Sequence, residues 1–472
     1  MSRAPGSGGG RTRLKEKAGL TEGGWDARSY AMQPLLRWVA LAALFAATVQ
    51  AAPRQLVTFT KQQLTDKFWA EGIAMGDLNR NGHADVVYGP FWFAGPDFRQ
   101  RHEYRPATAT FQLKDPDGTE RTVEGFEGGL GINNAYSDNF FTWTYDFNQD
   151  GWLDILVVGI PNAPAHWYEN PRGESGHWRR HTVFSEVDNE SPAFTDLTGD
   201  GRPELVCNHK GHFGYARPDW SDPSRPWTFH PITPNNNYHR YHHGLGVGDV
   251  NGNGRMDLLE KDGWWEQPES LAGDPVWRFH PFVFSPPTEP GVPVGGAQMF
   301  AYDVNGNGLN DVITCFASHG YWLVWWEQVR SGDEITFRQH TLTGRTPEEG
   351  STGVAFSQIH AIELVDIDGD GLLDILTGKR FWAHGPSGDP EPNAPAVVYW
   401  FQLVRHASGA VEYVPWLIDD NSGVGTEVAF GDVTGNGRPD VITGNKKGAF
   451  VFRQQARTVS PAEWEKAIAR PQ

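Results

Sequence analysis

The chain has 472 residues, 39% of them hydrophobic, and it contains 20 Trp and 55 Gly. This composition predicts a globular, turn-rich, all-β protein that is long enough to bury a large core. The formal net charge is −18 and no stripe of Lys and Arg is present to meet phosphates, which excludes nucleic acid as a partner.

Residues 1–51 are expected to form a leader with a secretory signal peptide. Residues 1–31 are rich in Gly, Arg and Lys, and Met32, which we expect to be the true start, opens the segment QPLLRWVALAALFAATVQAAP. A basic residue, a short apolar run and small residues at Val49 and Ala51 indicate cleavage after Ala51. A transmembrane anchor is the alternative, but it requires about 20 apolar residues. We therefore expect a secreted or periplasmic protein that keeps no transmembrane anchor after cleavage.

A nine-residue pattern recurs seven times along the rest of the chain. Its fullest form is DIDGDGLLD at Asp366, and the copies begin at Asp77, Asp146, Asp196, Asp249, Asp303, Asp366 and Asp432, at spacings of 69, 50, 53, 54, 63 and 66 residues. Oxygen side chains at alternate positions, a turn glycine and a closing carboxylate are what Ca²⁺ requires of a short loop. A single copy would also fit an Asx turn without metal, but seven copies indicate a repeat architecture.

The predicted calcium ligands are the side chains at positions one, three, five and nine of each copy. They are Asp77, Asn79, Asn81 and Asp85; Asp146, Asn148, Asp150 and Asp154; Asp196, Thr198, Asp200 and Glu204; Asp249, Asn251, Asn253 and Asp257; Asp303, Asn305, Asn307 and Asp311; Asp366, Asp368, Asp370 and Asp374; and Asp432, Thr434, Asn436 and Asp440.

Four strand-like runs can be assigned to each repeat. An apolar run precedes the loop, a second follows it, and an aromatic run such as HWYENP or GWWEQP and a fourth run such as WRFHPFV come next. Residues 52–455 are therefore predicted to form a seven-bladed β-propeller of four-stranded blades, with the calcium loops between the first two strands. Residues 56–60 should supply the missing outermost strand of blade seven. Residues 456–472 should form a short helical tail, capped by Ser460 and Glu463.

The seven loops resemble the FG-GAP, or VCBS-type, repeat of integrin-like propellers, and this resemblance covers roughly residues 56–455. It implies the propeller fold and calcium but no particular activity. The stretch QIHAIELVDIDGDGLLDILTGKRFWAHG also resembles the propeller part of the aldos-2-ulose dehydratase family. The chain lacks the cupin-like segment that this family carries beyond its propeller, so the resemblance implies a dehydratase activity at most.

The repeats provide an internal control that separates scaffold residues from site residues. Four histidines recur in the fourth strand, and we expect them to serve packing or hydrogen bonding: His181, His230, His280 and His340. By contrast, residues at the start of the first strand and the exit of the second differ between repeats. Both positions should open at one end of the central channel, opposite the calcium loops, which we call the channel mouth.

The non-repeating polar residues at the channel mouth are the candidate site. The candidate catalytic residues are His243, His360, Lys379, Arg380 and His384, and the candidate substrate-binding residues are Glu190, Gln298, His242, Trp382 and Tyr241. His243 and His360 could also bind a transition metal, although no Cys or H-x-x-x-H pairing supports this.

Three classes of function remain open. A lyase of the dehydratase type would use a mouth histidine as base next to a carbonyl, with Lys379 or Arg380 stabilising the enolate of a keto-sugar. A carbohydrate- or protein-binding module would use Trp382 and Tyr241 without chemistry. A structural propeller would bind no ligand.

Overall fold

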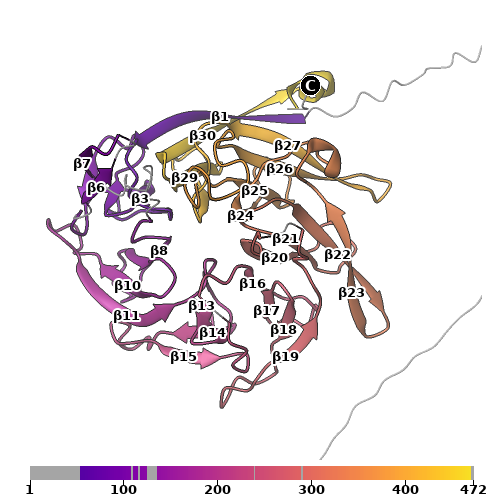
Figure 1. Cartoon of the computed structure of the whole chain (residues 1–472), viewed down its shortest axis with the longest axis horizontal. Coiled ribbons are helices and arrows are strands. Elements are labelled where there is room, and N and C mark those ends of the chain that lie inside the picture. Colours follow the sequence, from indigo (N-terminus) through magenta and orange to yellow (C-terminus); the bar gives the residue numbers. More distant parts are fainter. Residues whose placement is uncertain are drawn as a thin grey trace, which may run out of the picture. The chain divides into compact units, whose positions relative to one another are not determined.

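The computed structural model describes residues 54–107, 110–114, 117–124, 136–238, 240–288 and 291–468. Within this part of the chain, β-sheets follow one another around a common axis, so the all-β propeller arrangement is observed (Figure 1). None of the described helices is long and apolar enough to cross a membrane. The predicted leader, its signal peptide and Met32 lie outside the described residues, so export stays a prediction.

Each Asp-rich loop joins an innermost strand to a second strand, which begins at the closing carboxylate of the loop. Five repeats form separate four-stranded sheets. From the inside outward, these are β2 (Ala74–Gly76), β3 (Asp85–Tyr88), β4 (Phe91–Phe93) and β5 (Arg101–Glu103); β8 (Phe141–Tyr145), β9 (Asp154–Val158), β10 (Ala163–Glu169) and β11 (Arg179–Val187); β12 (Ala193–Thr195), β13 (Glu204–His209), β14 (His212–Arg217) and β15 (Thr228–Pro231); β24 (Ile359–Val365), β25 (Asp374–Lys379), β26 (Val398–Arg405) and β27 (Val411–Asp419); and β28 (Val428–Gly431), β29 (Asp440–Asn445), β30 (Gly448–Val459) and β1 (Arg54–Thr65).

The repeats at Asp249 and Asp303 share one eight-stranded sheet. Its strands are β16 (Leu245–Gly248), β17 (Asp257–Glu260), β18 (Gly263–Glu266) and β19 (Arg278–Pro281), with β20 (Gln298–Tyr302), β21 (Asp311–Cys315), β22 (Leu323–Ser331) and β23 (Glu334–Thr341). The innermost strands β16 and β20 pair in parallel, with Gly246 opposite Met299. A Cβ atom on Gly246 would lie 2.0 Å from the Met299 carbonyl oxygen, so glycine permits this close approach. The prediction of seven separate blades is therefore wrong here, because five separate sheets and one double sheet form instead.

The remaining elements lie outside these sheets. They are a two-stranded hairpin of β6 (Thr110–Lys114) and β7 (Glu120–Glu124), the 3₁₀ helix η2 (Pro347–Glu349) and the helix α1 (Pro461–Ala467). Helix α1 is capped as predicted, since the Ser460 side chain accepts a hydrogen bond from the Glu463 backbone N–H. Cys207 and Cys315 are free and buried.

Strand β1 closes the ring from the other end of the chain. It pairs antiparallel with β30 from Arg54 opposite Val459 to Thr65 opposite Ala449, and it is the outermost strand of that sheet (Figure 1). Leu56 and Val57 of β1 are buried in the same hydrophobic cluster as Phe450. The predicted role of residues 56–60 is confirmed, and the pairing removes an exposed edge from β30.

Two polar side chains join the innermost strands across the ring. Gln298 accepts a hydrogen bond from the Ile362 N–H at 2.9 Å and donates one to the Thr426 carbonyl at 3.2 Å. Glu427 accepts from the N–H groups of Ile73 and Thr142 at 3.0 and 2.8 Å. Apart from β16 and β20, which pair with each other, the innermost strands have one unpaired edge, so these side chains satisfy backbone N–H and C=O groups that the sheets leave open.

The recurring histidines of the fourth strands serve the scaffold, as expected. The His280 ring stacks on Trp264 at 4.0 Å, and its Nε2 atom lies 2.8 Å from a Glu266 carboxylate oxygen. The same combination of an aromatic ring and a carboxylate holds the other three, which are His181, His230 and His340.

Candidate functional site

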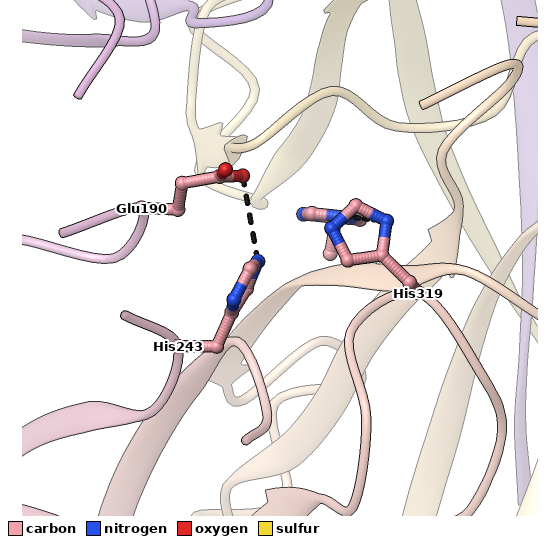
Figure 2. Close-up of side chains that lie close together, drawn as sticks. Glu190, His243 and His319 are labelled. Atoms are coloured by element: carbon pink, nitrogen blue, oxygen red, sulfur yellow. Dashed lines mark hydrogen bonds and ion pairs between the residues drawn. The ribbon is translucent and has the colours of Figure 1, made fainter. Parts of the chain in front are cut away.

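Four side chains from four different repeats converge on one point. Glu190 precedes β12, His243 precedes β16, His319 follows β21, and His360 lies on β24. One ligand atom from each lies within 4.8 Å of the others, and all four residues are buried. We call these four residues the central cluster. Figure 2 shows Glu190, His243 and His319 directed toward a common point.

The contacts within the central cluster are close. His243 Nε2 lies 3.5 Å from Glu190 Oε2, and His360 Nε2 lies 3.3 Å from His319 Nδ1. Among the described residues, the nearby Ser318 Oγ is buried without a hydrogen-bond partner, and the buried His243 Nε2 has the Glu190 carboxylate at 3.5 Å as its ion-pair partner. Buried polar atoms without partners are rare in folded proteins, and they are expected where a ligand or an ion completes the site.

The protonation states of Glu190, His319 and His360 suit a cation. Burial, together with the Arg380 charge, holds the pKa of His360 well below its usual value, and burial lowers the pKa of His319 to about 4. Burial alone would raise the pKa of Glu190, but His243 and Arg380 lower it to about 2. A carboxylate and neutral imidazoles are the donor set that Zn²⁺ and neighbouring transition metals prefer.

A buried group of charges lies directly beside the central cluster. Arg380 is 2% exposed and sits between two carboxylates, at 3.5 Å from Glu71 and 3.6 Å from Glu190. Its Nη1 atom also lies 3.3 Å from His360 Nδ1. Burial raises the pKa of Glu71 and lowers that of Lys446 to about 7, because neither charge is hydrated.

One histidine of the site is open to solvent. The His384 side chain is 45% exposed, and its Nδ1 atom lies 2.8 Å from Asp389 Oδ1. The same carboxylate oxygen lies 3.3 Å from His319 Nδ1. Burial would raise the pKa of Asp389, but its hydrogen bonds with His319 and His384 hold that pKa well below the usual range. Asp389 therefore links the exposed His384 to the central cluster.

The structure brings only some of the predicted site residues together. Glu190, His243, His360, Arg380 and His384 meet as described above. Lys379 is fully buried and its Nζ atom donates to Ser357 Oγ at 2.6 Å.

The remaining predicted residues lie around the cluster or within the scaffold. Gln298 joins inner strands, and the His242 ring packs on Phe213 and Tyr238. Trp382 donates to Asn393 Oδ1 at 2.9 Å, and Tyr241 is 44% exposed.

Asp389 was not among the predicted residues, whereas Glu71, His319 and Lys446 occupy non-repeating positions that the comparison between repeats assigns to the channel mouth without a specific role. His319 and Lys446 follow second strands at non-repeating positions, as Arg380 does, so the same comparison between repeats identifies them. Asp389 lies in the segment between β25 and β26, whose length is unlike that of the other repeats. Irregular insertions on a regular scaffold often carry function.

The Asp-rich loops differ in how well they fit a calcium ion. In every loop the closing carboxylate is fully buried; the residues are Asp85, Asp154, Glu204, Asp257, Asp311, Asp374 and Asp440. Burial raises the pKa of Asp374 to about 9, and a cation would offset this cost. Asp366, Asp368 and Asp374 place carboxylate oxygens within 4.8 Å of one another, whereas no group of three His, Cys, Asp or Glu ligands forms in the other described loops. Among the three loops that have at least three carboxylates, only the Asp366 loop brings three of them together.

Comparisons with known proteins identify the repeats. The model of the FG-GAP-like repeat family matches residues 146–207 and 303–377. No curated protein matches the chain. These comparisons give no link to aldos-2-ulose dehydratase.

Two solved structures are similar to this chain. One is the structure of an Agrocybe aegerita lectin, whose description is the structural basis of specific recognition of non-reducing terminal N-acetylglucosamine. The two sequences are 15% identical, the match covers 84% of this chain and 86% of that chain, and the TM-score is 0.39. The other is an auxiliary nutrient binding protein from Bacteroides ovatus ATCC 8483, which is 10% identical, with 73% and 82% covered and a TM-score of 0.38. On the evidence of the family match and the sheet topology, the chain contains FG-GAP-like repeats in a β-propeller arrangement.

Proposed function

We propose that this protein is a metal-dependent lyase that removes water from a keto-sugar at the channel mouth. The observation that carries the proposal is the central cluster, in which Glu190, His243, His319 and His360 bring four donor atoms within 4.8 Å of one another. None of the four belongs to a repeated packing position, so the scaffold does not account for them. A divalent transition-metal ion such as Zn²⁺ bound there supplies a Lewis acid for the substrate carbonyl.

The chain's own residues supply the proton transfers. His384, oriented by Asp389, takes the proton from the carbon next to the carbonyl, and the electron pair of that C–H bond forms the enolate. Arg380, which bears a fixed charge beside the central cluster, stabilises the enolate oxygen electrostatically. The enolate then expels the β-hydroxyl, to which His384 returns the proton, and the products are one water and an unsaturated ketone.

His384 is not one of the four donors of the central cluster, so its replacement tests the proposed base without removing a donor from that cluster. We expect His384→Gln to lower turnover by about 10²–10⁴-fold, the usual contribution of a general base, while metal content stays unchanged. The measurement is the rise of enone absorbance when the purified protein is incubated with 2-keto and 3-keto sugars. Turnover of His384→Gln at the wild-type rate would contradict the assigned role.

A carbohydrate-binding module without chemistry is the second candidate. It is favoured by the stacked rings of Phe381 and Trp382, whose centroids lie 4.8 Å apart near the mouth. In that case no sugar yields an enone, and Trp382→Ala lowers sugar affinity.

We also propose that the Asp-rich loops bind Ca²⁺, and that the Asp366 loop binds it most tightly. Affinity follows the number of charged ligands, and this loop has four carboxylates where the loops at Asp77, Asp249, Asp303 and Asp432 have two each. The loops at Asp146 and Asp196 have three carboxylates each, so their calcium affinity should be intermediate.

Calcium should raise the melting temperature, because the ion binds the folded loops and hardly the unfolded chain. At 100 times Kd one site contributes about 2.7 kcal/mol, or about 3 °C for a chain of this size. Asp368→Asn should weaken the tightest site, and Asn251→Asp, the same loop position in another repeat, should strengthen a weak one. Differential scanning calorimetry after chelation and after calcium addition measures both effects. An unchanged melting temperature after exhaustive chelation would identify the loops as Asx turns without metal.

A further inference from the structure

A cavity lies between the sheets of the first two repeats. None of its lining residues belongs to the central cluster. Its volume is ≈ 580 Å³, which is within the usual range for small-ligand sites. The residues that give it chemical character are Arg105, Asp138, His166, Tyr168, Trp178 and Arg180. His166 and Tyr168 lie on β10 and Arg180 on β11, so rigid strands hold one wall.

The charges of this cavity are oriented by an ion pair between a buried arginine and a half-exposed aspartate. The Arg105 side chain is 10% exposed and binds Asp138 through two contacts, Nη1 to Oδ2 at 2.7 Å and Nη2 to Oδ1 at 2.8 Å. Bidentate pairs of this kind are rigid and well oriented. The Arg105 Nε atom is buried and finds no hydrogen-bond partner among the described residues.

The cavity is positively charged in an otherwise acidic protein. Asp138 is the single carboxylate among the described lining residues, and its charge cancels that of Arg105. Arg180 therefore leaves the cavity with one net positive charge. Burial and the charges of Arg180 and Arg105 lower the pKa of His166 to about 4, so this ring is neutral near pH 7. The formal net charge of the chain is −18, so this local excess of positive charge favours an anionic group that most of the surface would repel.

The other lining groups favour a sugar ring. Asp138 is 52% exposed and keeps acceptor capacity for hydroxyl groups, and the largely buried rings of Tyr168 and Trp178 line the apolar part of the wall. We propose that this cavity binds a hexuronate residue, with its carboxylate on Arg180, its hydroxyls on Asp138 and its apolar face against Tyr168 and Trp178.

The test compares the methyl glycosides of glucuronic acid and of glucose by isothermal titration calorimetry. We expect the glucuronide to bind at least about tenfold more tightly than the glucoside, because only the glucuronide carries the carboxylate. Arg180→Met should weaken glucuronide binding about tenfold. Arg179→Met is the matched control, since Arg179 is exposed on the same strand and does not line the cavity, and its affinity should equal that of the wild type.

A second measurement reports the charge of the bound group. The His166 resonance, assigned by its loss in His166→Gln, should titrate at higher pH with the glucuronide bound, because a nearby carboxylate favours the imidazolium.

Four results would overturn the proposal: equal affinity for the two glycosides, unchanged affinity in Arg180→Met, no saturable binding up to about 10 mM, or loss of binding in His360→Ala. The last result would place the ligand at the central cluster, whereas failure of the lyase assay leaves this test unaffected.

Discussion

His360→Ala should abolish metal binding at the central cluster and lower turnover by at least about 10²–10³-fold. The substitution removes one of four donor atoms that lie within 4.8 Å of one another. Donors on a rigid scaffold cannot move to replace the missing ligand. The measurements are metal content by mass spectrometry of the purified protein and the initial rate of enone formation.

His340→Ala is the control for this experiment. His340 also packs near an aromatic ring and a carboxylate, with its ring 4.1 Å from Trp325 and its Nε2 atom 2.7 Å from Glu327. It occupies a repeated scaffold position, so its loss should cost some stability and leave metal content and rate unchanged. If His360→Ala retained metal and activity, the central cluster would not be the active site.

Deletion of residues 52–62 should lower the melting temperature by at least about 5 °C. The deletion removes most of β1, which exposes the edge of β30 and the apolar side chains that Leu56 and Val57 cover. Burial of two such side chains is worth about 3–6 kcal/mol before the lost backbone hydrogen bonds are counted, and a chain of about 400 residues loses about 1 °C for each 0.8 kcal/mol.

Point variants show whether the stability that β1 contributes comes from its buried side chains. Leu56→Ala should destabilise the protein by about 2–5 kcal/mol, since Leu56 is buried, whereas the exposed Thr58 should tolerate Ala within about 0.5 kcal/mol. Thermal unfolding followed by circular dichroism measures all three variants. A deletion variant that melts with the wild type would show that β1 contributes nothing to closure.

The sequence predicts the scaffold well because the scaffold repeats. A closing carboxylate after each turn glycine marks the first residue of the second strand in all seven repeats, from Asp85 to Asp440. Repetition also separates the packing histidines from the histidines of the site. His280 recurs in the fourth strand of four repeats and is a packing residue, whereas His243 and His360 stand at a position where the other repeats carry different residues, and they meet in the central cluster.

The site was predicted less completely, because its remaining parts depend on contacts between distant segments. Nothing local to Gln298 indicates that its amide joins Ile362 to Thr426 across the ring. Asp389 lies in an irregular insertion, so no repeat provides a comparison for it. Lys379 and Arg380 are neighbours in the chain, but strand alternation sends one side chain to Ser357 and the other to the central cluster.

The parallel pairing of β16 with β20 has a consequence for the way the protein opens. Hydrogen bonds that run from one repeat into the next make the strands β16 to β23 a single sheet, whereas each of the other sheets ends at its own innermost strand. Local unfolding proceeds in contiguous cooperative units, and slow amide hydrogen exchange reports their free energies. The two repeats that share this sheet should therefore lose exchange protection together, as one foldon about twice the size of its neighbours.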